Sequence, residues 1–552
     1  MKKKTIITGL VLALLSGCAG SAAPAETNSP VLADSEKETG AVIEDDAAIA
    51  ANLAEVREQR YQYGENEPEY ARKFADEYSR FALDMVNRTV SPDANYISSP
   101  LSVYCALAML SNAAAGDTAE QMNDVLGMTP EELNKALYMM FLRTDHSPPE
   151  DHPEWADMYR PTVFFGNALW LNSGAGFEVN ENYRHILQSY YNSDIVSEDF
   201  ADKGAVVQHV NDWIADKTKH MLENVYSEES LADGTLFLLI NSLAFEDRWF
   251  NEFFPDRNTD ETFRNQDGSE VTTAMMHSTE TGWWHDDHAQ GISKQLRQGG
   301  EVVLILPEEG MSVYDYLAQM DPDTFRNLHS ETVYADNITD TTYDEHYTYL
   351  TIPKFRYDLE LDLGETLRAM GLTRIFESDA NLSKMLASDY EKLFVSDKVI
   401  HKATVDLNEE GISAAAVTII GGLGAAGGLK PIPVYHDLVL DRPFIYAIVE
   451  GGVPLFIGVV SAMDGTILSG NKSVNQKLGT VDVKVDGLRV RTGPATYYDQ
   501  AGNVLAGDTL TVYETAEGEG YTWYRIGVRQ WIADKDGGWL GWRDEPRSSH
   551  AS

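Results

Sequence analysis

The chain is short of positive charge. Its 552 residues carry 43 Lys and Arg against 87 Asp and Glu, so the net charge is −44 at pH 7. No basic stripe exists that could neutralise phosphates, which argues against a nucleic-acid partner. A surface this acidic repels anionic membranes and favours encounter with basic proteins. With 43% hydrophobic residues the chain can still bury a sizeable core, and its length exceeds one ordinary domain.

Long apolar runs are scarce, and the first one is short. Lys2, Lys3 and Lys4 precede an apolar stretch from Ile6 to Leu15, which is too short to span a membrane and is typical of a secretory signal. The stretch ends in Leu15-Ser-Gly-Cys18, which resembles the lipobox of bacterial lipoproteins. That resemblance implies lipidation of Cys18, an exported chain, and anchoring at the cell membrane or surface. The alternative is a signal peptide that ends at a chance cysteine.

Cysteine is nearly absent, since the chain has only Cys18 and Cys105. If Cys18 carries lipid, no intrachain disulfide can form. Cys105 lies in an apolar run without electropositive neighbours, so we expect a buried, inert thiol rather than a nucleophile.

Motifs for catalysis are also lacking. Gly422-Leu-Gly-Ala-Ala-Gly427 has the spacing of a dinucleotide site, but Pro431 and Pro433 follow where such a site needs a helix. His285-Asp-Asp-His288 lacks the spacing of metal ligands on a helix and is typical of an exposed polar turn. We therefore expect no catalytic residue, cofactor or metal.

The most informative segment runs from Val405 to Ile420. Two carboxylates, Glu409 and Glu410, and Gly411 lead into small or β-branched residues without a charge. Such a strand can lie in solvent or in the middle of a sheet. With Val399-Ile-His-Lys-Ala403 before it and Asp441-Arg-Pro-Phe444 after it, the segment resembles the reactive-centre loop of the serpins, which inhibit serine or cysteine proteases.

Further motifs in the family's order support this resemblance from about Tyr70 to Asp464. They are Asn95 to Val103, Ala106 to Leu110, Gly116-Asp-Thr118, Asn167-Ala-Leu-Trp170, Asn211 to Ile214, Leu239-Ile-Asn-Ser-Leu243 with Phe245 and Trp249, Ile352-Pro-Lys-Phe355, Leu363 to Leu372, and Phe376 to Ser383. The resemblance implies an α+β serpin fold over residues 70–466, with three β-sheets, about nine helices and an exposed loop.

Two flanking regions complete the expected organisation. Residues 1–18 form the signal and lipobox, and residues 19–69, rich in Ala, Glu, Asp, Ser and Pro, are expected to be a disordered acidic tether. Helical spacing of Phe74, Tyr78 and Phe81 begins after Tyr70. Alternating valines after residue 479, followed by Gly507-Asp, Trp523-Tyr and Gly537-Gly-Trp, resemble a bacterial SH3-like barrel over residues 479–543. Its ligand is expected in the cell wall.

The resemblance implies a suicide mechanism. A protease cleaves the loop, the acyl-enzyme stays attached, and the freed segment enters a sheet as a new strand. In the family register the hinge is Glu409, Glu410, Gly411, Ile412, Ser413, Ala414, Ala415, Ala416, Val417 and Thr418. Ile412, Ala414, Ala416 and Thr418 would then point inward, and Ser413, Ala415, Val417 and Ile419 outward. All are uncharged, so none carries a large desolvation cost. Ile412 departs from the usual Thr or Ser, but it still favours a strand.

The scissile bond follows from the same register. Counting from Glu409 places it at Ala425–Ala426, which suits elastase-like or subtilisin-like pockets. The loop is several residues longer than in most serpins, so Leu423 and Leu429 are alternatives that suit chymotrypsin-like enzymes. Lys430 is disfavoured because Pro431 follows it.

We therefore expect an extracytoplasmic, monomeric inhibitor that is anchored by lipid or released outside the cell. Two other functions remain open at this point. One is a non-inhibitory serpin-like binding protein. The other is a cell-wall or peptide-binding surface protein that acts through the SH3-like domain.

Overall fold

The structure is a computed structural model of the whole chain. It describes the backbone of residues 6–17 and, beyond them, residues 46–92, 94–145, 162–176, 178–327, 332–339, 342–387, 393–409, 430–463, 479–491, 500–512, 514–518, 520–527, 530–535 and 537–544.

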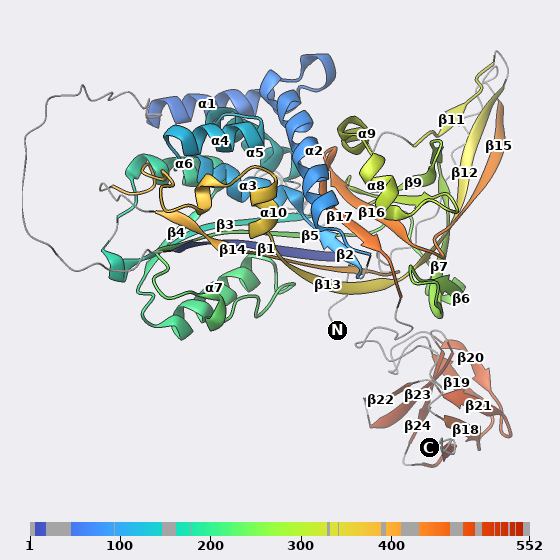
Figure 1. Cartoon of the computed structure of the whole chain (residues 1–552). Helices are drawn as coiled ribbons and strands as arrows, with labels where there is room; N and C mark the ends of the chain where they lie inside the picture. The colour runs from blue at the N-terminus through green and yellow to red at the C-terminus, as the bar shows by residue number, and fades with distance from the viewer. Residues whose placement is uncertain are drawn as a thin grey trace, which may run out of the picture.

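Three sheets form the body of the large domain, as expected (Figure 1). The large sheet has the order β13-β14-β1-β5-β3-β4, and the second sheet has the order β2-β17-β16-β10-β9-β8. The third sheet is β11-β12-β7-β6, with β15 paired to the other edge of β12. The strands of the large sheet are β1 (Ile6–Gly17), β3 (Val163–Asn172), β4 (Asp194–Glu198), β5 (Phe237–Asp247), β13 (Phe355–Asp362) and β14 (Phe394–Leu407).

The other two sheets share the remaining strands of this domain. The second sheet contains β2 (Tyr96–Ser98), β8 (Trp284–His285), β9 (Ala289–Gln295), β10 (Glu301–Pro307), β16 (Phe444–Glu450) and β17 (Val453–Val460). The third contains β6 (Thr259–Arg264), β7 (Glu270–Thr281), β11 (Ala335–Asp336), β12 (Thr342–Pro353) and β15 (Lys430–Val439).

Helices cover both faces of the large sheet. Along β5 the side chains alternate, so Leu239 and Leu243 join the main core while Leu238 and Ile240 join a second core beneath α7 (Lys203–Lys217). Figure 1 shows α7 alone on its face, opposite a layer of helices. That layer contains α2 (Glu69–Thr89), α3 (Pro100–Ser111), α4 (Gly116–Leu126), α5 (Pro130–Thr144) and α6 (Glu181–Tyr191). The remaining helices are α8 (Val313–Gln319), α9 (Pro322–Asn327) and α10 (Gly364–Ala369).

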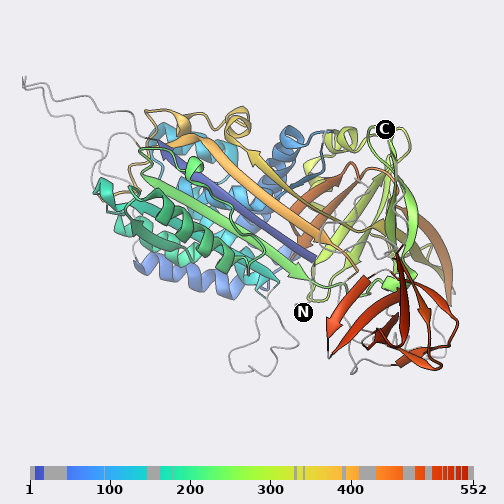
Figure 2. The ribbon, with the colours of Figure 1, turned by 90° about the horizontal axis from the view of Figure 1, so that it is seen from below.

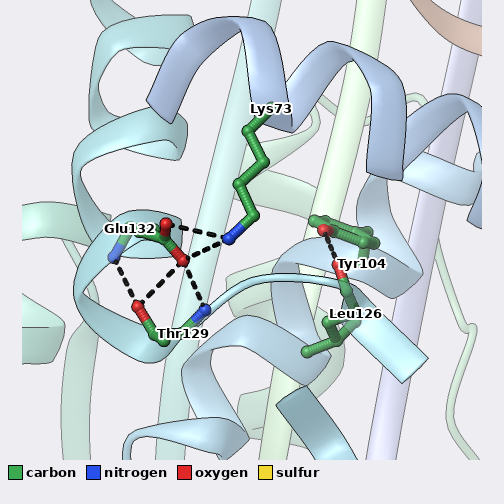
Figure 3. Close-up of polar contacts among 5 residues, drawn as sticks. All are labelled: Lys73, Tyr104, Leu126, Thr129 and Glu132. Carbon is green, nitrogen blue, oxygen red and sulfur yellow. Dashed lines mark hydrogen bonds and ion pairs between the residues drawn. The ribbon is translucent and has the colours of Figure 1, made fainter. Parts of the chain in front are cut away.

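Polar side chains fix the helix layer in register (Figure 3). Thr129 and Glu132 form a reciprocal capping box at the start of α5, and Lys73 of α2 donates to both Glu132 oxygens at 2.9 Å. These contacts hold the pKa of Glu132 below its usual range despite partial burial. The Tyr104 hydroxyl of α3 donates to the Leu126 carbonyl at 2.6 Å, which ties α3 to the end of α4. The layer above the large sheet is therefore braced by directional contacts as well as by apolar packing.

The tether expected over residues 19–69 is partly wrong. Residues 46–59 form helix α1 (Asp46–Gln59), so the described residues contain ten α-helices instead of about nine. Ile49 and Val56 of α1 are buried, and Val56 packs in a small cluster with Ala71 and Met139. The prediction was based on the average composition of the segment. It did not take into account that a helix places Ile49 and Val56, which are seven positions apart, on one face. Residues 18–45 lie outside the described residues.

The apolar leader was not expected to be part of the fold, yet it forms strand β1. Figure 2 shows this dark-blue strand between the green and orange strands of the large sheet. It is antiparallel to both neighbours, β14 and β5. An uncharged run rich in strand-forming residues can satisfy an open position in a sheet.

The carboxy-terminal region has its own sheets and its own core. A three-stranded sheet has the order β21-β18-β25, and a five-stranded sheet the order β20-β19-β24-β23-β22. Val481, Val490, Val512, Ile532 and Leu540 form its core. The strands are β18 (Gly479–Val483), β19 (Leu488–Arg491), β20 (Gln500–Val504), β21 (Thr509–Val512), β22 (Glu514–Gly518), β23 (Tyr521–Gly527), β24 (Gln530–Asp534) and β25 (Leu540–Asp544). This agrees with the predicted all-β SH3-like fold.

Among the described helices, we find none with the length and apolar character needed to cross a membrane.

Candidate functional site

The site is the space between β5 and β14 in the large sheet, which we call the strand slot. Residues Ile6 to Leu15 of β1 lie opposite Asp247 to Leu238 of β5, and Ile7 to Leu14 lie opposite Asp406 to Val399 of β14. The slot therefore offers hydrogen-bonding edges on both sides to one strand. That strand runs antiparallel to both walls.

A chain that reverses direction after β14 would run the same way. β14 ends at Leu407, and the predicted hinge starts at Glu409. A segment that turns back there becomes antiparallel to β14, which is the orientation that β1 has in the slot. The slot thus suits the residues that follow Glu409 in direction as well as in position.

Three side chains hold the base of the loop. Glu409 is ion-paired to Lys354, with Nζ 2.8 Å from Oε1, and it also accepts a hydrogen bond from the Asn258 side chain. Both charged groups are largely buried, so the pair is poorly screened. The indole Nε1 of Trp249 donates to the Asn408 carbonyl at 3.0 Å. These contacts fix the point at which β14 ends and the loop begins.

A buried ion pair supports Trp249 from behind. Lys294 pairs with Glu280 and donates to the Asn251 carbonyl at 2.8 Å, while its Nζ lies 5.1 Å from the Trp249 ring centre. Burial lowers the pKa of Lys294, and Glu280 acts against that shift. Removing one partner would leave the other charge buried without a partner, which costs about 3–5 kcal/mol.

A buried polar network crosses beneath the middle of the slot. Asn241 of β5 accepts from the Ser102 hydroxyl of α3 and donates to Asn167 Oδ1 of β3 at 2.7 Å. Asn167 in turn donates to the Tyr191 carbonyl at 2.7 Å. Asn241 lies opposite Leu12 of β1, at the centre of the slot. The network ties β5 to α3 and β3 beside the position that β1 occupies.

His401 faces the same point from the other wall. It lies opposite Leu12 on β14 and is fully buried, and its Nε2 accepts from the Ser99 backbone N–H at 3.3 Å. Nδ1 therefore carries the proton, and it has no hydrogen-bond partner among the described residues. Burial lowers the pKa of His401 to about 3, so the ring is neutral at physiological pH.

The other end of the loop is anchored too. β15 starts at Lys430 and pairs in parallel with β12, from Thr342 opposite Lys430 to Thr351 opposite Val439. Residues 410–429 are therefore tethered at Glu409 and at Lys430. Full entry into the slot requires one of these tethers to be released.

Most of the predicted site residues cannot be placed. The hinge residues Glu410 to Thr418, the bond Ala425–Ala426, the alternatives Leu423 and Leu429, the glycine motif Gly422 to Gly427, and Cys18 lie outside the described residues. Glu409 lies two residues beyond the end of β14. Cys105 is buried with a raised pKa because of desolvation, which agrees with an inert thiol.

His285 to His288 are exposed, as predicted, but His285 is the last residue of strand β8 and only Asp286 to His288 connect it to β9. Asp286 Oδ1 accepts from the backbone N–H groups of His288 and Ala289 at 2.7 and 2.6 Å. Within the part of the chain that the structure describes, no three His, Cys, Asp or Glu side chains are grouped to hold a metal ion.

Several residues that build the site were not predicted to have a role. Asn167, Asn241, Trp249 and Lys354 all fall inside motifs that carried the resemblance. Their presence was the signal, but their partners are distant in the chain, so one sequence cannot show what they contact. Apart from its apolar character, no feature of the leader sequence predicted that it occupies the slot.

A family model described as Serpin (serine protease inhibitor) matches residues 76–463, and one described as Bacterial SH3 domain matches residues 486–546. Neuroserpin from Mus musculus is 30% identical over 400 residues, which cover 70% of this chain and 91% of that protein.

Two solved structures show the same fold. The native state of the thermophilic serpin tengpin has a TM-score of 0.57 and 26% identity, covering 73% of this chain and 96% of tengpin. The native stressed conformation of Arabidopsis AtSerpin1 has a TM-score of 0.58 and 21% identity, covering 72% and 99% of the two chains.

Proposed function

Because the chain belongs to the serpin family, we propose that it is a suicide inhibitor of serine proteases that acts by inserting its cleaved loop into the strand slot. Serpins generally inhibit proteases, although some members do not. The observation that carries the proposal is the slot itself, which accepts one strand antiparallel to β14 directly beside the anchored hinge at Glu409.

The protease supplies the catalytic groups, and the loop of this chain is the substrate that it attacks. Its serine Oγ attacks the carbonyl carbon of Ala425, the bond to Ala426 breaks, and the amine of Ala426 leaves with the proton that the serine gave up. The new bond is an ester between the protease and residue 425. The segment that starts at Glu410 is then free at its far end, while Lys430 stays in the third sheet.

Insertion follows because the freed segment gains backbone partners on both sides. Residues 410–425 contain no charge beyond Glu410, so little must be desolvated. Sixteen residues at roughly 3.3 Å each extend about 50 Å, which carries the attached protease across the domain. A displacement of only about 1 Å in a catalytic group can cost roughly a hundredfold in rate. The distorted protease then hydrolyses the ester too slowly to release itself, so the covalent adduct persists.

The slot must be vacant for this step. Residues 1–17 have the features of a signal peptide, so their removal before Cys18 would take β1 out of the slot. Lipidation of Cys18 would then anchor the mature inhibitor outside the cytoplasm, and the SH3-like domain would bind the cell wall.

The cognate enzyme is elastase-like or subtilisin-like if cleavage occurs after Ala425, and chymotrypsin-like if it occurs after Leu423 or Leu429.

The test is incubation of the mature chain, residues 18–552, with a panel of serine proteases, followed by a denaturing gel. We expect an adduct at the summed mass of the inhibitor and one protease. Mass spectrometry of the released fragment then identifies the scissile bond. Cleavage of the loop by every protease without any adduct would reject inhibition and leave a non-inhibitory binding role.

A further inference from the structure

The third sheet presents tyrosines to solvent on one face. Along β12 the side chains alternate, so His346, Thr348 and Leu350 are buried, while Tyr347 and Tyr349 point to the other side. On β15, Tyr435 lies opposite Tyr347, and Asp437 lies opposite Tyr349. We call Tyr347, Tyr349, Tyr435 and Asp437, with Thr279 and Thr281 of β7 beside them, the tyrosine face.

The rings of this face are ordered against one another. Tyr435 stacks on Tyr349 with ring centres 5.4 Å apart and planes within 7°, and on Tyr347 with centres 5.5 Å apart. Tyr349 and Tyr435 are nevertheless 46% and 55% exposed. Tyrosine is enriched in protein interfaces because it offers a large amphipathic surface with few rotatable bonds. Stacking restrains the rings in advance, which lowers the entropy cost of docking.

The face continues from the end of the loop. β15 starts at Lys430, directly after residues 410–429, and Tyr435 lies five residues further on. Five strand residues span about 17 Å. A protein interface of standard size buries about 800 Å² on each partner, which corresponds to a patch roughly 30 Å across. A protein bound to the carboxy-terminal half of the loop therefore reaches the tyrosine face.

Among the described strands β15 pairs only with β12, and its other edge argues against strand addition by a second copy of the chain. Pro431 and Pro433 lie in the half of β15 nearest the loop, and both lack a backbone donor. The two prolines are two positions apart, so their nitrogen atoms point to the same edge of the strand. An added strand would need backbone donors at both positions on that edge. The tyrosine face thus remains available to a globular partner.

We infer that the tyrosine face is a second docking surface for the target protease and contributes to its selection. This inference rests on the proposed function and extends it from the scissile bond to the protease surface. Exposed Asp437 beside Tyr349, on a chain of net charge −44, suits a protease whose surface next to the active site is basic. Contacts on this face would raise the rate of encounter and leave the later insertion step unchanged.

The test uses the double variant Tyr349→Ser/Tyr435→Ser with a protease that cleaves the wild-type loop. The readout is the second-order rate of loop attack, counted as adduct plus cleaved inhibitor. We expect this rate to fall about tenfold while the ratio of adduct to cleaved inhibitor stays constant. Asp437→Lys should lower the rate as well and weaken its dependence on salt.

Two controls separate docking from folding. Tyr349→Phe/Tyr435→Phe keeps the rings and should stay within twofold of wild type. Tyr61→Ser removes a tyrosine that is 72% exposed on another surface and should have no effect. An unchanged rate in the double serine variant overturns the inference, even if adducts form. A lowered rate in a chain that never forms an adduct supports the docking face and rejects the trapping mechanism instead.

Discussion

At the scale of single residues, the alternation of the hinge decides whether insertion can proceed. Ala416 is expected to face the core once the loop enters the slot, whereas Ala415 faces the opposite side. The proposed mechanism requires that neither residue belongs to the sheet before cleavage, so a carboxylate at either position should leave the uncleaved fold intact. The two neighbours therefore form a matched pair.

We predict that Ala416→Glu converts the inhibitor into a substrate. In the inserted state its carboxylate would be buried without a partner, which costs several kcal/mol or forces protonation. Insertion should stall and the ester should hydrolyse, so the adduct on a denaturing gel disappears while the rate of loop cleavage stays near wild type. Ala415→Glu should keep most of the adduct. Equal loss in both variants would mean that the register or the mechanism is wrong.

His401 makes the large sheet sensitive to acid. Its pKa is about 3 in the fold because of burial, against about 6.5 in an unfolded chain. The unfolded state therefore binds the proton first, so stability is fully present above about pH 6.5 and is lost as the pH falls through this window toward 3. Between pH 6.5 and 4.5 this group lowers the free energy of unfolding by about 2 kcal/mol.

The measurement compares urea unfolding of wild type and His401→Gln at pH 7.5 and 4.5. Glutamine can still accept from the Ser99 N–H, but it does not titrate. We expect wild type to lose more stability than the variant between the two pH values. His220→Gln, which changes an exposed histidine, should follow wild type. An equal loss in wild type and His401→Gln would exclude His401 as the acid-sensitive group.

At the scale of secondary-structure elements, strand β1 occupies the position that the proposed mechanism assigns to the cleaved loop. We predict that the full chain, residues 1–552, yields mainly cleaved inhibitor, while a chain that starts at residue 18 yields mainly adduct. Leu12→Pro in the full chain should restore adduct formation, because proline cannot donate in a central strand. The adduct fraction on a gel measures each case. Equal fractions in the full and shortened chains would show that β1 does not block insertion.

Elements with strong local patterns were predictable from sequence. The spacing of Phe74, Tyr78 and Phe81 predicted the helix that became α2, and alternating valines predicted strands in the carboxy-terminal domain. Helix α1 was missed because its segment was interpreted from its average composition, whereas Ile49 and Val56 are buried by packing against the main core and against Ala71 and Met139. β1 was missed because its partners lie more than two hundred residues away.

The candidate site shows the same limit. Glu409 was placed at the hinge by its motif, but Lys354 and Asn258, which hold it, are 55 and 151 positions away. Such pairs depend on the path of the whole chain. The resemblance supplied the motifs, and the fold supplied the contacts between them.

At the scale of the whole molecule, two units divide the work. The serpin match ends at residue 463 and the SH3 match begins at residue 486, and each region has its own apolar core. We predict that deletion of residues 479–552 leaves the adduct fraction unchanged and lowers retention on isolated cell walls. Residues 479–552 alone should bind the walls. Loss of adduct formation on deletion would mean that the two units act as one.

The contacts of Glu409 with Lys354 and Asn258, which we call the clamp, bear on how long the proposed inhibitor stays active before its loop inserts spontaneously. In the proposed mechanism an unused inhibitor waits without inserting its loop, and the contacts of Glu409 with Lys354 and Asn258, together with the bond from Trp249 to the Asn408 carbonyl, would lengthen that wait. The same contacts would have to break within the short lifetime of the ester, so they would also slow insertion. An inhibitor with a tighter clamp would stay active longer but trap a smaller fraction of proteases. One with a looser clamp would insert its loop faster but lose activity sooner. In the proposed mechanism, the buried ion pair just beyond β14 would therefore set the compromise between storage time and speed of capture.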